Sequence, residues 1–488
     1  MLVRDGCVRV SRGGIVLRRA IKTQFCVVVF GVWAGVFGVI SSDARAEAKI
    51  SVAASGELRI RIKLLPAGNE WSFRNAYAGV LGIAERVDEF HAFGSAGEDL
   101  SAKKIATGIF KSQPGATSIT YVVKLPPPTA ADVSHVSWIV GDSGLLLLAD
   151  LMPESLPGVM LEFSLPSEWT CLTAAPMDYQ QRYYAKQPEK GVFLIGRSLR
   201  TQAELGKASL LRCFIGGDWP FRDDVILSAA MKVMQAYTAL THFAPLEPPV
   251  VMLVPLPVAT GSVKWRAETR GSTTVLLMDP QAEIKNWKGQ LGIIFTHELL
   301  HLWVPNSLRL EGDYDWFFEG FTLYTALVTA LDLKFIDFDE YLRTLARVYD
   351  SYLSRPDDLS LIDASERRWT SGNSVVYDKG MLVAFLYDLL ITRQSGGRSR
   401  LADLYRELFR EAPEPANGND AIIALLSSSP AAADLAKAYI QSSKELELET
   451  ALASYGLRLD TTGKSSTFRL NSELRPDQKQ LLKSLGYR

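Results

Sequence analysis

The sequence H-E-x-x-H, from His297 to His301, is the feature that most constrains this chain. It lies in an apolar run from Phe295 to Trp303, which favours a buried helix. Positions four apart lie nearly above one another on a helix, so His297 and His301 present their imidazoles on one face. Imidazole is a preferred zinc ligand, and Glu298 lies about 100° further round the helix, close enough to act as a base. The spacing predicts a zinc site, and the alternative is a pair of histidines that only pack.

A third ligand is expected from the segment that follows. Pro305 ends the first helix, and a second, strongly aromatic helix is predicted from Asp313 to Tyr324. Glu319 lies inside this apolar helix, where a carboxylate costs several kcal/mol unless a cation compensates it. We therefore expect Glu319 to complete a His2Glu zinc site. The acidic alternatives, which we interpret as solvated linker and cap residues, are Glu311, Asp313 and Asp315.

Seventeen residues separate H-E-x-x-H from Glu319-Gly320-Phe321-Thr322, and this arrangement resembles the gluzincin zinc metallopeptidases. That group includes aminopeptidase N and the glycyl aminopeptidases. Downstream, Tyr377-Asp378-Lys379-Gly380 is similar to a Tyr-x-Lys-Gly segment of both families. The segments at 360–365 and 438–457 resemble the glycyl aminopeptidases more closely, although the chain has no room for the PDZ module that many of them carry.

The resemblance implies a thermolysin-like catalytic domain with Zn²⁺ held by His297, His301 and Glu319. Glu298 would be the general base of such a site. In the resembling families the tyrosine that matches Tyr377 donates a hydrogen bond to the oxyanion formed when water adds to the substrate carbonyl. A tyrosine that only packs at the start of a helix is the alternative.

The segment from Ala267 to Thr273 is similar in position to one whose glutamate faces the free amino group of the substrate in these families. It lies between two predicted strands, Val250–Val254 and Thr273–Met278. The resemblance makes Glu268 a candidate for binding the substrate amine, and the alternative is a solvated loop glutamate. An exposed strand edge beside the zinc helix would align the substrate backbone.

Residues 1–46 predict a secretory signal peptide. A basic leader precedes an uncharged apolar run from Phe25 to Ile40, and Ala44-Arg45-Ala46 is an A-x-A cleavage sequence. We therefore expect export to a bacterial periplasm or the extracellular space. Retention of the apolar run as a membrane anchor is the alternative.

The remainder predicts an α+β multidomain protein. Period-two alternation, as in Leu58–Leu64 and Ile119–Val123, favours an N-terminal β-sandwich-like domain. From residue 223 helical periodicity takes over, apart from the two strands beside Glu268. The predicted domains are an N-terminal β domain at 47–220, a thermolysin-like catalytic domain at 221–345 and a helical C-terminal domain at 346–488.

The charge balance limits the expected partners of the protein. The leader holds seven basic and two acidic residues, so the rest carries 46 Lys and Arg against 52 Asp and Glu. No basic field is present to attract nucleic acid, and we expect no nucleic acid as a partner.

Two cysteines, Cys171 and Cys213, remain after the leader. They form either one disulfide or two buried thiols.

Three functions agree with these features. An exported zinc aminopeptidase comes first, because of the family resemblance. A zinc endopeptidase with the same mechanism would also cleave peptides with blocked N-termini. A catalytically inactive peptide-binding protein is the third, and the presence of Glu298 beside all three predicted ligands argues against it.

Overall fold

The computed structural model describes residues 46–487, with gaps at 54, 155, 207–208, 260, 262–263, 282–288, 355–357 and 412–414. The chain divides into two units, Met1–Ser42 and Asp43–Arg488. The first unit, and with it the predicted signal peptide as far as residue 45, lies outside the described residues. Among the described residues, no helix has the length and apolar character that crossing a bilayer requires.

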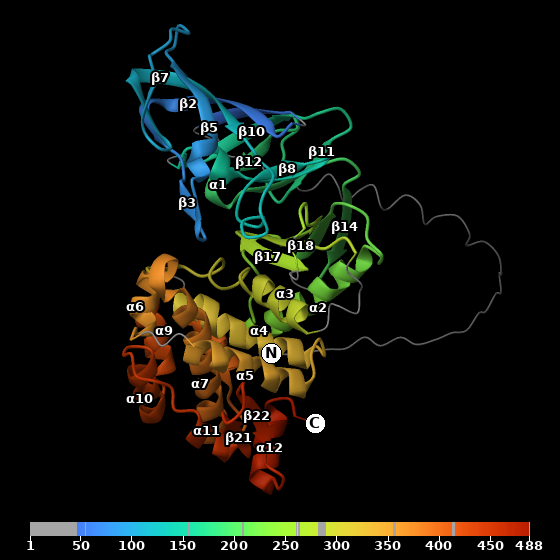
Figure 1. Ribbon diagram of the computed structural model, residues 1–488, viewed down its shortest axis with the longest axis vertical. Helices are drawn as coiled ribbons and strands as arrows, with labels where there is room; N and C mark the ends of the chain where they lie inside the picture. Colours follow the sequence, from blue (N-terminus) through green and yellow to red (C-terminus); the bar gives the residue numbers. More distant parts are fainter. Residues whose placement is uncertain are drawn as a thin grey trace, which may run out of the picture. The chain divides into compact units, whose positions relative to one another are not determined.

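The N-terminal part contains two β-sheets that enclose one core (Figure 1). The larger sheet has the order β12-β10-β1-β2-β7-β5, with β6 on β7, and the smaller has the order β11-β13-β9-β8. Alternate residues of β2 are buried from Leu58 to Leu64, as the period-two pattern predicts. These residues share one buried cluster with Phe193 of the smaller sheet. The predicted N-terminal β-sandwich-like domain is therefore confirmed.

The bounds of these elements follow the chain. The strands of the larger sheet are β1 (Ala46–Val52), β2 (Glu57–Ser72), β5 (Val87–Phe93), β6 (Lys103–Ala106), β7 (Ile109–Lys124), β10 (Val159–Ser164) and β12 (Tyr183–Ala185). Those of the smaller sheet are β8 (Trp138–Val140), β9 (Ser143–Leu147), β11 (Thr170–Thr173) and β13 (Val192–Gly196). The shorter elements are β3 (Ala76–Tyr77), β4 (Val80–Leu81), η1 (Ile83–Arg86), α1 (Leu148–Leu151) and η2 (Pro188–Lys190).

A third sheet carries the predicted catalytic region, in the order β14-β15-β16-β18-β17. β15, β16 and β18 are parallel, whereas β14 and β17 run antiparallel at the two edges. β14 and β15 precede residue 221, so the sheet crosses the domain boundary expected there. The strands are β14 (Arg200–Leu205), β15 (Leu210–Ile215), β16 (Val250–Pro255), β17 (Trp265–Arg270) and β18 (Thr273–Met278).

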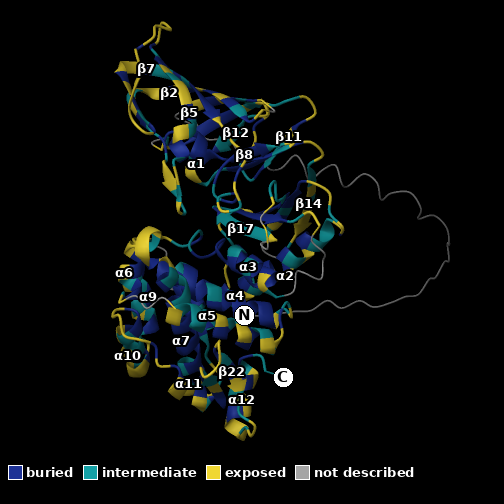
Figure 2. Ribbon diagram, viewed as in Figure 1, coloured by how far each residue is buried: buried dark blue, intermediate teal, exposed yellow. Residues whose placement is uncertain are grey.

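Helices α2 (Asp224–Thr241) and α3 (Gln290–Leu300) pack beside this sheet and lead into the helical C-terminal part (Figure 1). A single buried cluster joins the sheet to these helices, and Figure 2 shows the dark blue interior that results. The other helices are α4 (Thr322–Asp332), α5 (Phe338–Ser354), α6 (Leu361–Glu366), α7 (Gly380–Gln394), α8 (Leu401–Glu411), α9 (Gly418–Leu426), α10 (Pro430–Tyr439), α11 (Glu449–Ser454) and α12 (Pro476–Ser484). Short strand pairs complete this part, namely β19 (Leu310–Glu311) with β20 (Ala416–Asn417) and β21 (Leu457–Asp460) with β22 (Thr467–Leu470).

Within the described residues of the helical part lie three π-helical turns, η4 (Trp316–Phe321), η5 (Arg368–Gly372) and η6 (Val375–Lys379). η4 and α7 approach one another closely at Gly320 and Gly380. A Cβ atom on Gly320 would lie 2.6 Å from the Cα atom of Gly380, so a side chain at position 320 would force one of the two backbones to shift. This approach places the end of η4 against the junction of η6 and α7. Predicted functional residues lie on both sides of the contact.

Candidate active site

The C-terminal end of α3 presents both histidines of the H-E-x-x-H sequence. Burial of apolar residues such as Phe295 fixes the helix in the core. The Nε2 atoms of His297 and His301 lie 3.1 Å apart. On the other side of each ring, His301 Nδ1 lies 2.9 Å from the Val304 carbonyl oxygen and His297 Nδ1 lies 3.4 Å from the Thr322 hydroxyl. These contacts orient both Nε2 atoms toward a common point.

Glu319, on η4, lies at the same point. Its Oε2 is 3.2 Å from His297 Nε2 and 3.5 Å from His301 Nε2. Burial of this carboxyl opposes ionisation, but the charge of His301, hydrogen bonds from both histidines and the charge of Arg368 hold its pKa well below the ordinary value. The structure therefore brings the three predicted ligands together, with the carboxylate ionised.

The donor atoms fit one tetrahedral zinc ion. Zinc bonds of about 2.0–2.1 Å at tetrahedral angles place two donors about 3.3 Å apart, and the observed separations are 3.1–3.5 Å. Two imidazoles and one carboxylate are also a known donor set of catalytic zinc sites. The alternative ligands Glu311 and Asp313 are exposed.

Glu298 belongs to the same cluster. A carboxylate oxygen of Glu298 and ring nitrogens of His297 and His301 all lie within 4.8 Å of one another. Burial raises the pKa of Glu298, although the charges of the two histidines oppose this shift. A carboxylate with a raised pKa accepts a proton from water more readily, as a general base must.

Arg368, on η5, joins the predicted ligand to the predicted oxyanion donor. Its Nη2 atom donates to Glu319 Oε1 at 2.6 Å and to the Tyr377 hydroxyl oxygen at 3.1 Å. Its Nη1 atom donates to Asp315 at 2.5 Å. Asp315 is thus a buried partner of Arg368, and its interpretation as a solvated cap residue is wrong. Sequence reasoning did not single out Arg368.

Tyr377, on η6, faces this cluster. Burial and the charge of Glu319 raise the pKa of its phenol well above the ordinary value, so the hydroxyl keeps its proton at neutral pH. A protonated phenol beside Glu319 and Arg368 is able to donate to an oxygen that develops negative charge.

Glu268 lies on edge strand β17 and not in a loop. The neighbouring Thr269 donates from its hydroxyl to the carbonyl oxygen of Glu298 at 2.7 Å, so β17 lies directly against α3. The Glu268 side chain is 13% exposed, and the Tyr77 hydroxyl donates to its Oε1 at 2.8 Å. His135 Nδ1 donates to Oε2 at 2.8 Å. The interpretation of Glu268 as a solvated loop residue is therefore wrong.

Tyr77 connects the residues around Glu268 to the side of the site that η5 forms. It comes from β3 of the N-terminal part, and its ring lies 5.9 Å from the ring of Trp369 between centroids. Trp369 stacks on the guanidinium of Arg368 at 4.5 Å and is 59% exposed. Contacts of Tyr77 thus link the N-terminal part both to Glu268 on β17 and to Trp369 on η5.

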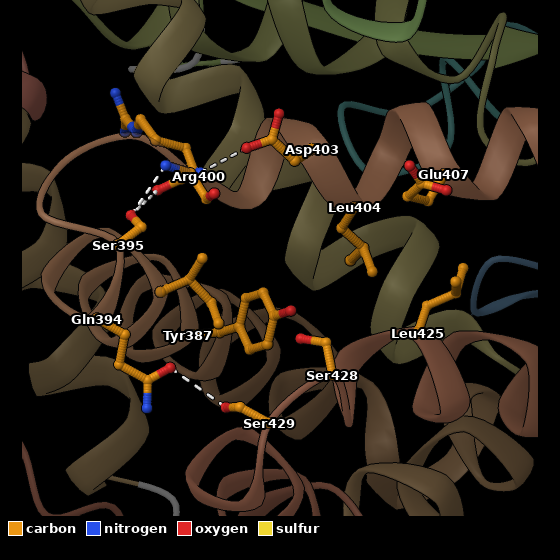
Figure 3. A pocket seen from close by; sticks show the side chains of 12 residues that line it. Tyr387, Gln394, Ser395, Arg400, Asp403, Leu404, Glu407, Leu425, Ser428 and Ser429 are labelled. Atoms are coloured by element: carbon orange, nitrogen blue, oxygen red, sulfur yellow. Dashed lines mark hydrogen bonds between the residues drawn. The ribbon is translucent and has the colours of Figure 1, made fainter.

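A separate pocket of about 390 Å³ lies among α7, α8 and α9 (Figure 3). Its polar groups hydrogen-bond one another, for example Ser429 to Gln394 Oε1 at 3.2 Å and the Arg400 amide to Asp403 at 2.9 Å. None of its lining residues is a predicted zinc ligand or Glu298.

The two described cysteines are separate thiols. Cys171 lies on β11 and Cys213 on β15, in different sheets, and neither forms a disulfide. Burial raises the pKa of each to about 12, so both thiols stay protonated at neutral pH.

No protein-family model matches the chain, and no curated protein matches its sequence. Solved structures do match its fold. An aminopeptidase N family protein from Idiomarina loihiensis is 18% identical with a TM-score of 0.73, over 86% of this chain and 81% of that one. An M1 zinc metallopeptidase from Deinococcus radiodurans is 11% identical with a TM-score of 0.53, over 83% and 94% of the two chains. A mutant of the latter, bound to a Tyr-Ser-Ala substrate, gives the same identity and TM-score over 82% and 94%.

These likenesses show the fold. The α+β architecture predicted for the chain is confirmed, and so is its resemblance to the gluzincin group at the level of the fold.

Proposed function

We propose that this protein is a zinc-dependent metallopeptidase that hydrolyses peptide bonds. The observation that carries the proposal is the convergence of His297 Nε2, His301 Nε2 and Glu319 Oε2 within 3.1–3.5 Å. Glu298 lies beside these donors, where a hydrolytic site needs a base. Solved structures with the same fold include zinc metallopeptidases, which supports the proposal.

Zn²⁺ held by His297, His301 and Glu319 would supply Lewis acidity, which acidifies water and polarises the substrate carbonyl. Glu298 accepts a proton from the attacking water and passes it to the departing amine. Tyr377 donates its phenolic hydrogen to the oxygen that gains charge when water adds to the carbonyl. A donor of this kind contributes roughly 2.7–4 kcal/mol to the transition state.

Hydrolysis at the free N-terminus of a peptide is the first candidate for the finer specificity. The supporting observation is the place of Glu268 on β17, one residue from the strand's contact with Glu298. Hydrolysis within a chain is the second candidate. It is favoured because both oxygens of Glu268 already accept hydrogen bonds from the protein.

We also propose that the protein is exported. The basic leader, the apolar run and Ala44-Arg45-Ala46 support this proposal. N-terminal sequencing of the protein recovered from cell fractions is the test. A mature N-terminus at Glu47 is expected, and an intact leader in a cytoplasmic fraction would contradict the proposal.

The test of the peptidase proposal combines metal analysis with turnover. We expect one zinc ion per chain and hydrolysis of unstructured peptides, monitored by mass spectrometry. Glu298→Gln should retain the zinc and lose about 10²–10⁴-fold in kcat, because only the base is removed. A zinc-free protein, or full activity of Glu298→Gln, would contradict the proposal. Binding of peptides by the zinc-loaded protein without any turnover would indicate the inactive binding protein instead.

A further inference from the structure

The charges around Glu268 differ from those that a site for a substrate amine needs. A carboxylate that recruits an ammonium group has to present uncompensated negative charge. Glu268 instead forms an ion pair with Arg270, whose Nη2 lies 2.8 Å from Glu268 Oε1. The Arg270 side chain is only 7% exposed, so water screens this pair weakly.

The remaining bonding capacity of Glu268 is small. Oε1 faces the Tyr77 hydroxyl and Arg270, and Oε2 accepts from His135 Nδ1, all at 2.8 Å. A carboxylate offers about four acceptor positions, and the hydrogen bonds from Tyr77 and His135 fill one on each oxygen, while the ion pair with Arg270 covers Oε1. A substrate amine could bind Glu268 only beside the groups already in contact with it.

Two more arginines extend the positive charge. Arg74 and Arg270 lie over the ring of Tyr77, at 4.3 Å and 4.4 Å from its centroid. Arg74 and Arg86 both pair with the fully buried carboxylate of Asp150, at 2.5 Å and 3.2 Å. The three arginines therefore face two carboxylates, Asp150 and Glu268, and the group carries no net negative charge.

We propose that Arg270 determines substrate specificity by cancelling the charge of Glu268, so that peptides with a blocked N-terminus are accepted alongside those with a free amino group. This inference rests on the proposed peptidase function. An approaching ammonium group is attracted by Glu268 and repelled by Arg270, whereas an acetylated terminus experiences neither effect. The substrate class is therefore extended peptides irrespective of the charge at the N-terminus.

The test uses a matched pair of short peptides, one with a free N-terminus and its N-acetyl counterpart. The measured quantity is the ratio of kcat/KM for the free peptide to that for the acetylated one. This ratio is independent of the fraction of active enzyme. For the native protein we expect a ratio within about tenfold of unity. Arg270→Met should raise the ratio at least about tenfold, because Glu268 then presents its full charge.

Two further variants separate charge from structure. Arg270→Lys keeps the positive charge and should leave the ratio near that of the native protein. The double variant Glu268→Gln with Arg270→Met removes both charges, and its ratio should return toward the native value. If Arg270→Met does not fold, the ratios of the native protein and of Arg270→Lys still decide whether blocked peptides are accepted.

Binding of the same peptides to zinc-loaded Glu298→Gln, measured by calorimetry, gives a second ratio that needs no turnover. Equal affinities within about tenfold support the inference. A preference of about 10³-fold or more for the free peptide, in turnover or in binding, would overturn it, as would an unchanged ratio in Arg270→Met. Hydrolysis of neither peptide would contradict the peptidase proposal, and the binding ratio would still decide the role of Arg270.

Discussion

Arg368 is the residue on which the geometry of the predicted zinc site depends most, apart from the ligands. It binds Oε1 of Glu319, so Oε2 is the oxygen left to face the two histidines. Hydrogen bonds to ligating carboxylates fix their orientation, and their loss typically costs 10–100-fold in metal affinity. Asp315 holds the guanidinium from its other side.

We predict that Arg368→Met weakens zinc binding by about 10–100-fold in a chelator competition assay. Arg368→Lys should restore part of the affinity, because the ammonium group can still reach one carboxylate. Arg400→Met is the matched control, since Arg400 lines the separate pocket and pairs with a buried carboxylate, Asp388. Unchanged zinc affinity in Arg368→Met would contradict the role of this residue.

Lys379 gives a prediction about pH. The residue is 2% exposed, and burial lowers its pKa to about 8. The unfolded chain therefore binds more protons than the folded protein between about pH 8 and the ordinary lysine pKa near 10.4. Over that interval the free energy of unfolding should rise with pH, on the order of 2 kcal/mol from this residue.

The measurement is urea denaturation of the native protein and of Lys379→Met at pH 7 and pH 9.5. The stability of the native protein relative to the variant should increase at the higher pH. A difference that is the same at both pH values would show that Lys379 is not desolvated.

At the scale of single residues, the sequence revealed the features that depend on neighbouring positions in the chain. The spacing of His297 and His301 follows from the helical period, and Glu319 stands out as an acid in an aromatic segment. Arg368 reaches Glu319 across 49 positions of the chain, and His135 reaches Glu268 across 133. Such contacts leave no periodic trace in one sequence, so neither residue could be identified from it.

At the scale of helices and strands, the contact between η4 and α7 fixes the position of Glu319 relative to Tyr377. Gly320 follows Glu319 directly, and Gly380 begins α7 just after η6. A methyl group at Gly320 would force the two backbones apart. Overpacking of this kind typically costs 1–3 kcal/mol.

We therefore predict that Gly320→Ala lowers the free energy of unfolding by about 1–3 kcal/mol and also reduces kcat, because Glu319 moves relative to Arg368 and Tyr377. Thermal melts and turnover of one peptide measure the two effects. Gly463→Ala is the control, because its added methyl group would meet no atom closer than 3.4 Å. A stable and fully active Gly320→Ala would show that the helices can separate without consequence.

Element boundaries were predictable where periodicity is strong. Helical periodicity was expected from residue 223, and α2 begins at Asp224; the strand expected at Val250–Val254 corresponds to β16. The helix expected from Asp313 begins instead as the π-helical turn η4, and the alternative of a loop at Glu268 proved to be strand β17. The segment around Glu268 is a strand because it pairs with β18, and pairing partners are not encoded in the local sequence.

For the whole molecule, metal binding should couple to stability. Two of the predicted ligands lie at the C-terminal end of α3 and the third on η4, so an ion held by all three would tie separate segments of the chain together. At a free zinc concentration about 100 times Kd, binding adds about 2.7 kcal/mol to the free energy of unfolding. Removal of zinc with a chelator should therefore lower Tm, and added zinc should restore it. In His301→Ala the shift should shrink strongly, and an equal shift there would show that zinc binds elsewhere.

Domain organisation was the least predictable property at this scale. The boundary expected at residue 220 cuts through the sheet that contains β14 and β15, and one buried cluster runs on past residue 345. Hydrophobic periodicity identifies elements but not which of them share a core, because that depends on contacts between distant segments. The arrangement of β-rich and helical parts was nevertheless correctly predicted.

Within the described residues β17 ends its sheet, so one side of its backbone has no strand partner. A polypeptide that pairs there has to be extended over several residues, which a segment inside an intact domain cannot achieve until it frays. We therefore expect the survival of a protein exposed to the proposed peptidase to follow that protein's own local unfolding equilibrium. Unravelled ends and small fragments would be consumed, while well-folded neighbours in the same solution would persist.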